Sequence, residues 1–169
     1  DVRQFGADPK GNQNCTSAFT QAIYWLTSQK AVNGIVFIPS GTFRFRELRN
    51  DLSCCFLVPS NITLMGVGPT SILQLGASEY KTLFQNSDFT NGNTNITLRN
   101  LRITGNRANN ASGSADGVIF NNVSNLLLED VEIDNCRGDG LWLDGCLMPR
   151  ITRVYAHDNG RNGIGTSNC

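Results

Sequence analysis

The sequence predicts an all-β fold of the parallel β-helix type, a solenoid in which successive coils of the chain stack on one another. Glycines at positions 117, 140 and 163 recur every 23 residues, and each follows an Asp or Asn. After residue 61, short apolar segments alternate with Asn- and Gly-rich turns and show no helical period. Short strands that recur at a fixed interval of this length are typical of stacked β-coils.

One amphipathic helix is expected before the coils. Asn14 or Thr16 can cap its first turn. A short strand and a loop are expected in front of it, and two short strands around a Pro-Ser-Gly turn behind it, in residues 34–45. The apolar residues that share the helix face have the spacing i, i+3, i+4, i+7, and they are Phe19, Ala22, Ile23 and Leu26.

We therefore divide one continuous domain into two parts. Residues 1–60 hold the N-terminal strand, the capping α-helix and the first strands, and residues 61–169 hold the β-helix coils. The chain ends in a strand with no capping segment, which would expose a parallel edge and an apolar core. For this reason we expect an N-terminal fragment of a longer protein.

The repeat fixes a register between neighbouring coils. A shift of 23 residues places Leu128 on Ile151 and Cys146 on Cys169, and one coil earlier the period lengthens to 30, with the extra residues in the polar loop 106–115. Alternate side chains of a strand point to opposite faces, so half of them should face the core. The residues expected inside are Val118, Phe120, Leu141, Leu143, Ile164 and Thr166.

The outward columns give an independent check on this register. In the same alignment, side chains of opposite or compatible charge become neighbours on adjacent coils. Each such pair contributes about 0.2–1 kcal/mol on an exposed face, so the pairs test the stacking more than they explain stability. The pairs are Arg99 with Glu129, Arg102 with Glu132, Asp130 with Arg153, and Asp134 with His157.

Composition and charge exclude several classes of partner. The 14 basic and 14 acidic residues give a formal net charge of zero, so nothing points to nucleic acid or an anionic membrane. No apolar run reaches the roughly 18 residues that a membrane span requires. The sequence has six cysteines without a C-x-x-C pair and one histidine, so we expect no zinc site. Cys146 and Cys169 are expected as stacked buried thiols more than as a disulfide.

Several segments carry a family resemblance. The opening DVRQFGADPKGNQNCTSAFTQAI resembles the entry segment of pectin-lyase-like right-handed β-helix proteins, with Asn14 and Cys15 in place of the usual Asp pair. IVFIPSGTFRF and NITLMGVGPTSILQL are similar to the strand turns of that superfamily. ITGNRANNASGSADGV, GDGL and AHDNGRNGI resemble coils of bacterial polysaccharide lyase, rhamnogalacturonase and mannuronan epimerase modules. The resemblance covers nearly the whole chain and implies a right-handed β-helix with an N-terminal capping helix.

The resemblance also implies an activity. It points to an extracellular polysaccharide-active protein, a lyase or hydrolase of an acidic or plant-type glycan. Calcium is implied as a cofactor by the resemblance alone, since no acid cluster of the pectate lyase kind is seen. The alternative is a non-catalytic β-helix module, such as a carbohydrate-binding, adhesin or phage tailspike-like scaffold, the last of which implies a trimer. Whether the chain is an enzyme stays open, because a fold does not determine a function.

The catalytic motif of the epimerases is not matched. In those enzymes the coil that resembles GDGLWLDGC carries Asp-Pro-His-Glu, and here the four positions are Trp142, Leu143, Asp144 and Gly145. The lysine that the family has before its Asp-Gly pair falls on Ser114. These residues therefore give no support to epimerase chemistry.

Trp142 and Asp144 are the first candidates for a site. They lie two residues apart and point outward together, with Gly165 above the indole and Ile119 below it. A sugar ring stacks its C–H face on an indole while a hydroxyl donates to a carboxylate, so we expect both residues to bind substrate and Asp144 to be a catalytic candidate. The alternative is an indole covered by the loop 106–113, with Asp144 completing a turn.

Asp139, His157 and Arg161 complete the candidate set. Asp139 is a catalytic candidate as the second carboxylate of a hydrolase, but turn aspartates before glycine bond the nearby backbone and are not expected to face a groove. His157 is the sole histidine and a catalytic candidate as acid or base, or else is anchored over Asp134. Arg161 is a candidate substrate-binding residue, or one of the solvated polar residues of a turn.

Overall fold

The protein is built from short strands and one α-helix, as a computed structural model shows for residues 1–29, 33–47, 52–113 and 115–169. The helical elements are η1 (Val2–Phe5), α1 (Thr16–Ser28) and η2 (Arg107–Asn109). The strands are β1 (Lys10–Asn14), β2 (Gly34–Phe37), β3 (Gly41–Phe45), β4 (Cys54–Val58), β5 (Ile62–Met65), β6 (Ser71–Leu75), β7 (Thr82–Asn86), β8 (Thr94–Thr104), β9 (Val118–Asn121), β10 (Ser124–Asp134), β11 (Leu141–Asp144), β12 (Arg150–His157) and β13 (Ile164–Ser167).

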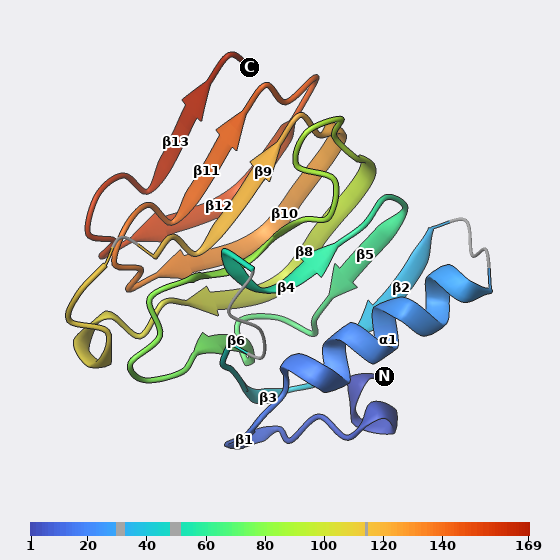
Figure 1. The fold of residues 1–169 in the computed structure, drawn as a ribbon, viewed down its shortest axis with the longest axis vertical. Coiled ribbons are helices and arrows are strands. Elements are labelled where there is room, and N and C mark those ends of the chain that lie inside the picture. Colours follow the sequence, from blue (N-terminus) through green and yellow to red (C-terminus); the bar gives the residue numbers. More distant parts are fainter. Residues whose placement is uncertain (30–32, 48–51, 114) are drawn as a thin grey trace.

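The strands form two parallel sheets that run along a solenoid. One sheet has the order β1-β3-β6-β8-β10-β12, with β5 paired to β8 and β2 paired to β5, and the other has the order β13-β11-β9-β7-β4. Strands that are neighbours in a sheet come from successive coils, and β9, β11 and β13 lie side by side in Figure 1. The chain therefore climbs from α1 at one end of the solenoid to β13 at the other, which is the parallel β-helix that the repeat predicts.

The long strands β8, β10 and β12 each bend once, and the bend divides a coil into three faces. The first half of β8 pairs with β5 and its second half with β6. At the bends, Asn100, Asp130 and Arg153 have φ of 53°, 54° and 50°, in the left-handed region that Asn and Asp adopt more readily than other side chains. One residue per coil in this conformation is enough to turn the strand.

A ladder of asparagines holds a second corner. Asn61, Asn95 and Asn125 stack on successive coils with φ of 63°, 57° and 55°. The side-chain amide of Asn95 donates to Asn61 Oδ1 at 2.9 Å, and that of Asn125 donates to Asn95 Oδ1 at 2.6 Å. Each asparagine therefore supplies the left-handed backbone, and Asn95 and Asn125 each also donate a hydrogen bond to the coil below.

The interior is a stack of apolar side chains. The rings of Phe45, Phe56, Phe84 and Phe120 follow one another along the axis, with centroid separations of 5.1, 4.9 and 6.3 Å. The inner positions of β9 and β11 are also filled as predicted, because Val118, Phe120, Leu141 and Leu143 are buried. Burying side chains of this size contributes about 1.5–3 kcal/mol each.

Two expectations about the ends of the chain were wrong. Ile164 is 39% exposed and Thr166 is exposed, although both have the predicted register on Leu141 and Leu143, because they lie in the last described coil and nothing stacks on them. The opening segment is the 3₁₀ helix η1 instead of a strand, since the Asp1 carboxylate accepts the amide of Arg3 at 2.9 Å. The first strand, β1, lies in the expected loop.

The predicted register between coils is confirmed. Leu128 lies on Ile151 and Asp134 on His157. Three of the four predicted charge pairs are formed: Arg99–Glu129 at 2.7 Å, Arg102–Glu132 at 3.4 Å and Arg153–Asp130 at 2.6 Å. The fourth pair is stacked without a hydrogen bond between its members, because His157 bonds other carboxylates.

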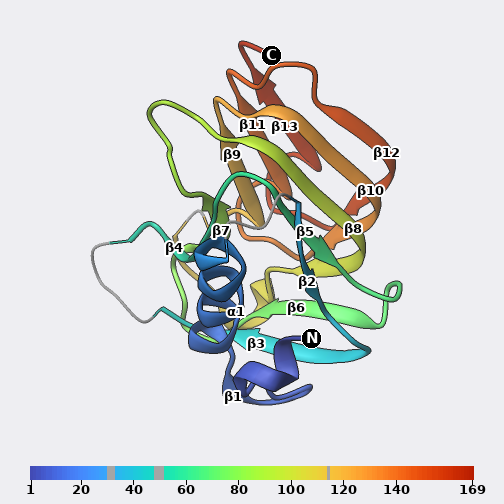
Figure 2. The same ribbon diagram turned by 90° about the vertical axis from the view of Figure 1, so that its right-hand side faces the viewer.

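Helix α1 lies against the first coil, in contact with β2 and β4 (Figure 2). Its N-cap is Cys15, and Asn14 Oδ1 accepts the amide of Thr16 at 3.1 Å, so Asn14 has the capping role that the sequence offered it. All six cysteines are free thiols, and Cys169 is exposed, contrary to the expected pair of buried thiols. Among the described residues, no helix is both long enough and apolar enough to cross a bilayer.

The ladder can be tested by replacing Asn95 with alanine. Asn95→Ala puts a less suitable residue at positive φ, at about 1 kcal/mol, and removes two side-chain hydrogen bonds of about 0.5–1.5 kcal/mol each. We expect the free energy of unfolding, measured by urea denaturation, to fall by roughly 2–4 kcal/mol. Asn100→Ala is the matched control, because Asn100 shares the strand and the positive φ but forms no side-chain hydrogen bond among the described residues. Equal losses in the two variants would show that the ladder bonds contribute nothing.

Candidate functional site

A cavity of about 280 Å³ opens on the outer face of the sheet that contains β9 and β11. Four of the residues singled out in the sequence line it, namely Asp139, Trp142, Asp144 and Arg161. The others are Phe89, Asp116, Ile119 and Asn121. Successive coils, from the turn after β7 to the turn before β13, thus bring two aromatic rings, three carboxylates and one guanidinium to a single depression.

Trp142 lies at the middle of this face. Its strand neighbours are Ile119 on the coil below and Gly165 on the coil above, as the register predicts. A Cβ added to Gly165 would lie 2.5 Å from Trp142 Cε3, so the indole rests on the backbone of that glycine. The residues of the loop 106–113 do not line the cavity, whereas Phe89, from the turn after β7, does.

Asp144 presents a carboxylate oxygen that is available to a ligand. Its Oδ1 accepts a hydrogen bond from the side chain of Asn168 at 3.0 Å, and its Oδ2 accepts none from the described residues. Asn121 lies beside it on the coil below and donates its side-chain amide to the carbonyl of Phe89 at 2.9 Å. That bond fixes the amide orientation and leaves Asn121 Oδ1 directed elsewhere as a free acceptor.

A ladder of acidic side chains forms the corner next to these strands. Asp116 Oδ1 accepts the backbone amide of Asp139 at 2.6 Å, and Asp139 Oδ1 accepts that of Asn162 at 2.7 Å. The glycine that follows has no room for a side chain, since a Cβ on Gly140 would lie 2.6 Å from the carbonyl of Gly163. The 23-residue Asx–Gly repeat is therefore a stacked turn, as predicted.

Arg161 joins two steps of this ladder. Its Nη2 lies 2.9 Å from Asp116 Oδ1 and 3.0 Å from Asp139 Oδ2. The two carboxylates are largely buried while the arginine side chain is half-exposed. Asp139 bonds the next turn, as expected of a turn aspartate, and its other oxygen pairs with Arg161, so it borders the cavity without a free carboxylate oxygen.

Asp116 is a lining residue that the sequence analysis did not single out. Burial raises the pKa of its carboxyl group above the usual range, against the lowering effect of the Asp139 amide and of Arg161. The 23-residue column does place Asp116 directly below Asp139, so the position was visible in the sequence. Phe89 comes from the turn after β7 and has no such signal.

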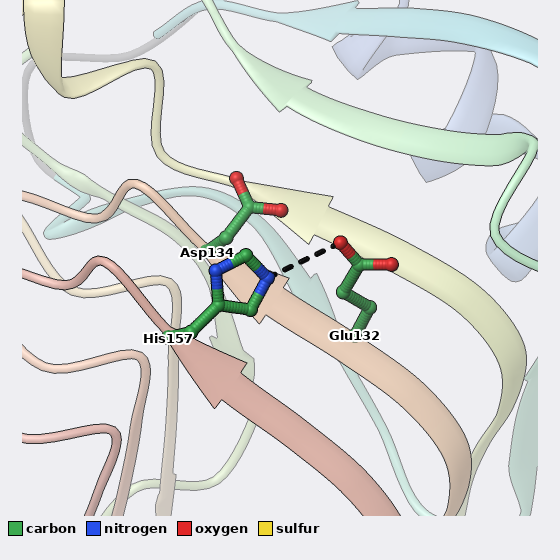
Figure 3. Close-up of side chains that lie close together, drawn as sticks. All are labelled: Glu132, Asp134 and His157. Carbon is green, nitrogen blue, oxygen red and sulfur yellow. Dashed lines mark hydrogen bonds and ion pairs between the residues drawn. The ribbon is translucent and has the colours of Figure 1, made fainter.

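His157 belongs to a different part of the molecule. It ends β12, in the other sheet, and does not line the cavity, so the structure does not bring it together with Asp139 and Asp144. Figure 3 shows it beside Glu132, with Asp134 close by. His157 Nδ1 lies 2.7 Å from Asp158 and Nε2 lies 3.3 Å from Glu132, and its ring stacks on Tyr155 with centroids 4.3 Å apart.

Calcium fits neither group of acidic residues. Among the described residues, only Glu132, Asp134 and His157 bring three metal-binding atoms within 4.8 Å of one another. This group contains an imidazole, whereas calcium takes oxygen ligands, and Arg102 already lies 2.6 Å from Asp134. The three cavity aspartates do not converge in this way. Among the described residues, carboxylates alone therefore do not assemble the calcium site that the family resemblance implies.

Comparisons with known proteins define the family. Residues 58–169 match the family model described as "Right handed beta helix region". The chain belongs to the right-handed β-helix family. It is 28% identical over 175 residues to the mannuronan C5-epimerase AlgE5 of Azotobacter vinelandii, a match that covers 97% of this chain and 17% of that protein.

Solved structures of the same fold span more than one kind of protein. The A-module of the Azotobacter vinelandii mannuronan C-5 epimerase AlgE4 superposes with a TM-score of 0.82 at 21% identity, covering 99% of this chain and 49% of that one. ORF18 of Geobacillus virus E2 superposes with a TM-score of 0.77 at 22% identity, covering 94% of this chain and 30% of that one. The chain thus spans about half of the epimerase module and less of the other proteins, and these likenesses establish the fold.

This chain is similar to the epimerases but lacks the Asp-Pro-His-Glu motif that the sequence analysis compared. The four positions that differ from Asp-Pro-His-Glu include Trp142 and Asp144, which line the cavity. Ser114, which takes the place of the family's lysine, lies outside the described residues. The site of this β-helix therefore carries its own set of side chains.

His157 gives a prediction for the dependence of stability on pH. The hydrogen bond to the Asp158 carboxylate, and then the one to Glu132, raise the pKa of His157 in the folded protein. Its stabilising contribution is therefore complete below the unfolded pKa of about 6.5 and is lost as the pH rises through the higher folded value. We expect His157→Gln to lower the free energy of unfolding more at about pH 5.5 than at about pH 9. Urea denaturation of both proteins at the two pH values measures this, and equal effects would contradict it.

Proposed function

We propose that this chain belongs to an extracellular polysaccharide-active protein and that its Trp142 cavity receives a sugar ring. The observation that carries the proposal is the presence, in one cavity, of the Trp142 indole, the Phe89 ring and a carboxylate oxygen of Asp144 without a partner among the described residues. An indole offers a flat apolar face for the C–H groups of a pyranose, and a free carboxylate oxygen accepts a hydroxyl. The polysaccharides on which such proteins act lie outside the cell, and this is why we propose an extracellular location.

The relatives support the ligand class. The curated relatives are named as mannuronan epimerases, enzymes on a polysaccharide, and the similarity runs along nearly the whole of this chain. The cavity of this chain lies on strand β11, which carries most of the window that corresponds to the epimerase motif, residues 142–145. The polysaccharide proposal therefore draws on both the relatives and the chemistry of the lining.

For the reaction, we propose glycoside hydrolysis in preference to elimination. Hydrolysis uses one carboxyl with a raised pKa as the proton donor and one ionised carboxylate as base or nucleophile. Asp116, whose pKa burial raises, and Asp144 suit these roles. Elimination from a uronate requires a free cation beside the sugar carboxylate, and Arg161 is already held by two aspartates. Asp139 would then act as a positioning residue for Arg161.

A second candidate function is a non-catalytic glycan-binding module. The observation that favours it is the use of Asp116 and Asp139 in the corner ladder, where each accepts a backbone amide of the next coil. Carboxylates placed for this reason are needed by the fold whether or not the protein turns over a substrate. Asp116→Asn separates the two functions, because a hydrolase loses turnover and keeps binding in this variant, whereas a binding module shows no turnover even as wild type.

Binding can be tested with Trp142→Ala. Loss of the stacking face should weaken binding of a recognised oligosaccharide at least about tenfold, equivalent to about 1.4 kcal/mol, in isothermal titration calorimetry. Trp25→Ala is the matched control, because Trp25 is 53% exposed on α1 and does not line the cavity. Unchanged affinity in Trp142→Ala, or an equal loss in both variants, would contradict the proposed binding site.

We also propose that α1 caps the first coil. Phe19 is fully buried, and its ring lies 5.8, 4.8 and 5.8 Å from those of Phe43, Phe45 and Phe56, so the helix covers the lower end of the phenylalanine stack. An uncovered solenoid end would expose this stack to water.

The cap predicts a large effect of Phe19→Ala. We expect the free energy of unfolding to fall by about 3–5 kcal/mol, because a buried ring is lost from a packed site, and we expect increased binding of an apolar dye at the opened end. Tyr24→Ala on the same helix is the control, since Tyr24 is 72% exposed, and it should change stability little. A small effect of Phe19→Ala, with no dye binding, would contradict a capping role.

A further inference from the structure

We infer that the Trp142 cavity selects a neutral sugar and discriminates against uronates. The inference rests on the proposed polysaccharide function and names the substrate class of the same site. The ionisable groups of the lining are Asp116, Asp139, Asp144 and Arg161, a formal charge of −2. If Asp116, whose pKa is raised, binds a proton, the charge is still −1. A carboxylated sugar would enter a cavity of its own sign.

Arg161 does not offset this charge for a ligand. Its Nη2 is shared between Asp116 and Asp139 at 2.9 and 3.0 Å, and both carboxylates are almost completely buried. If the arginine turned toward a uronate, it would leave two buried carboxylates without their cation. A buried charge without a partner costs several kcal/mol of free energy, so this movement is unfavourable. The Arg161 guanidinium therefore stays bound to the two aspartates and does not bind a ligand. Among the lining carboxylates, Asp144 is the one that no cation of the described residues pairs with.

The cavity aspartates also do not form a site for a metal ion that could bridge the sugar carboxylate and the protein. Among the described residues, the cavity aspartates do not form a group of three ligand atoms within 4.8 Å. Asp139 has both oxygens engaged, one by Asn162 and one by Arg161. The lining therefore lacks both routes by which a protein commonly neutralises a uronate, a free arginine and a bound divalent cation.

The free polar atoms of the cavity point to the same class of ligand. Asp144 Oδ2 and Asn121 Oδ1 accept no hydrogen bond from the described residues, and they come from positions that pair directly across adjacent strands. Both are acceptors. Sugar hydroxyls can donate to each of them, whereas the carboxylate group of a uronate cannot and would be repelled by Asp144, so a uronate has one group fewer with which to satisfy these acceptors. With the Trp142 indole alongside, the cavity matches a neutral pyranose that stacks on one face and donates two hydroxyls.

The experiment compares neutral and acidic glycans on the same protein. Calorimetric titration uses soluble oligosaccharides of β-glucan, mannan and galactan against oligomannuronate and oligogalacturonate of equal length, with chelator and at moderate salt. We expect at least one neutral ligand to bind, and to bind at least about tenfold more tightly than either uronate. Asp144→Asn should weaken the neutral ligand and improve the uronates. Asp158→Asn, which removes an exposed carboxylate just after β12 and outside the cavity, should change neither.

The outcomes separate this inference from the proposed function. Uronate binding that is tighter than neutral binding, and that is lost in Trp142→Ala, would overturn the neutral-sugar inference and leave the polysaccharide site in place. The absence of binding to every glycan, by protein whose circular dichroism shows it folded, would overturn the proposed site and the inference together. A uronate preference that survives Asp144→Asn unchanged would show that the charge of the lining does not select the ligand.

Discussion

The backbone hydrogen bonds between strands one coil apart are the constraint on which the rest of the structure depends. They hold each residue directly over the residue 23 positions earlier in the later coils, as at Leu141 between Val118 and Ile164. A side chain that faces the core on one coil therefore faces it on the next, and the phenylalanine stack follows from this. The same rule puts Asp116, Asp139 and Asn162 in one line, where each carboxylate reaches the amide above it.

The corner aspartates link the fold to the site. A turn in a β-helix needs a residue that bonds the next coil, and Asp supplies this with one carboxylate oxygen. The second oxygen of Asp139 remains, and with Asp116 it holds Arg161 over the cavity. The local charge and shape of the cavity are thus by-products of the way the corner is stabilised. Changing Asp139 would disturb the stacking of coils as well as the lining, so its role at the site is best read through conservative variants.

The sequence predicts the parts of this structure that repeat. The 23-residue period and the alternation of apolar residues were sufficient for the register, three ion pairs and the outward direction of Trp142 and Asp144. The bridge from Arg161 to Asp116 was not predictable in this way, because it spans two coils and depends on the conformation of a long side chain. Phe89 reaches the cavity from an irregular turn, and η1 depends on a local side-chain hydrogen bond of Asp1. The sequence repeat predicts neither feature, because neither belongs to the repeating coil.

The backbone hydrogen bonds between coils also explain how this chain can resemble the epimerases and yet lack their catalytic motif. Inward columns are fixed by packing, since Leu141 and Leu143 must fit between the coils above and below. Outward positions such as Trp142 and Asp144 have no such partner in the core, and the backbone hydrogen bonds do not depend on their side chains. A β-helix can therefore exchange every side chain on the outer face of one strand and keep its fold. For this reason the chemistry of the cavity must be argued from Trp142, Asp144, Asp116 and Arg161 themselves, and their charges and free acceptors favour a neutral glycan.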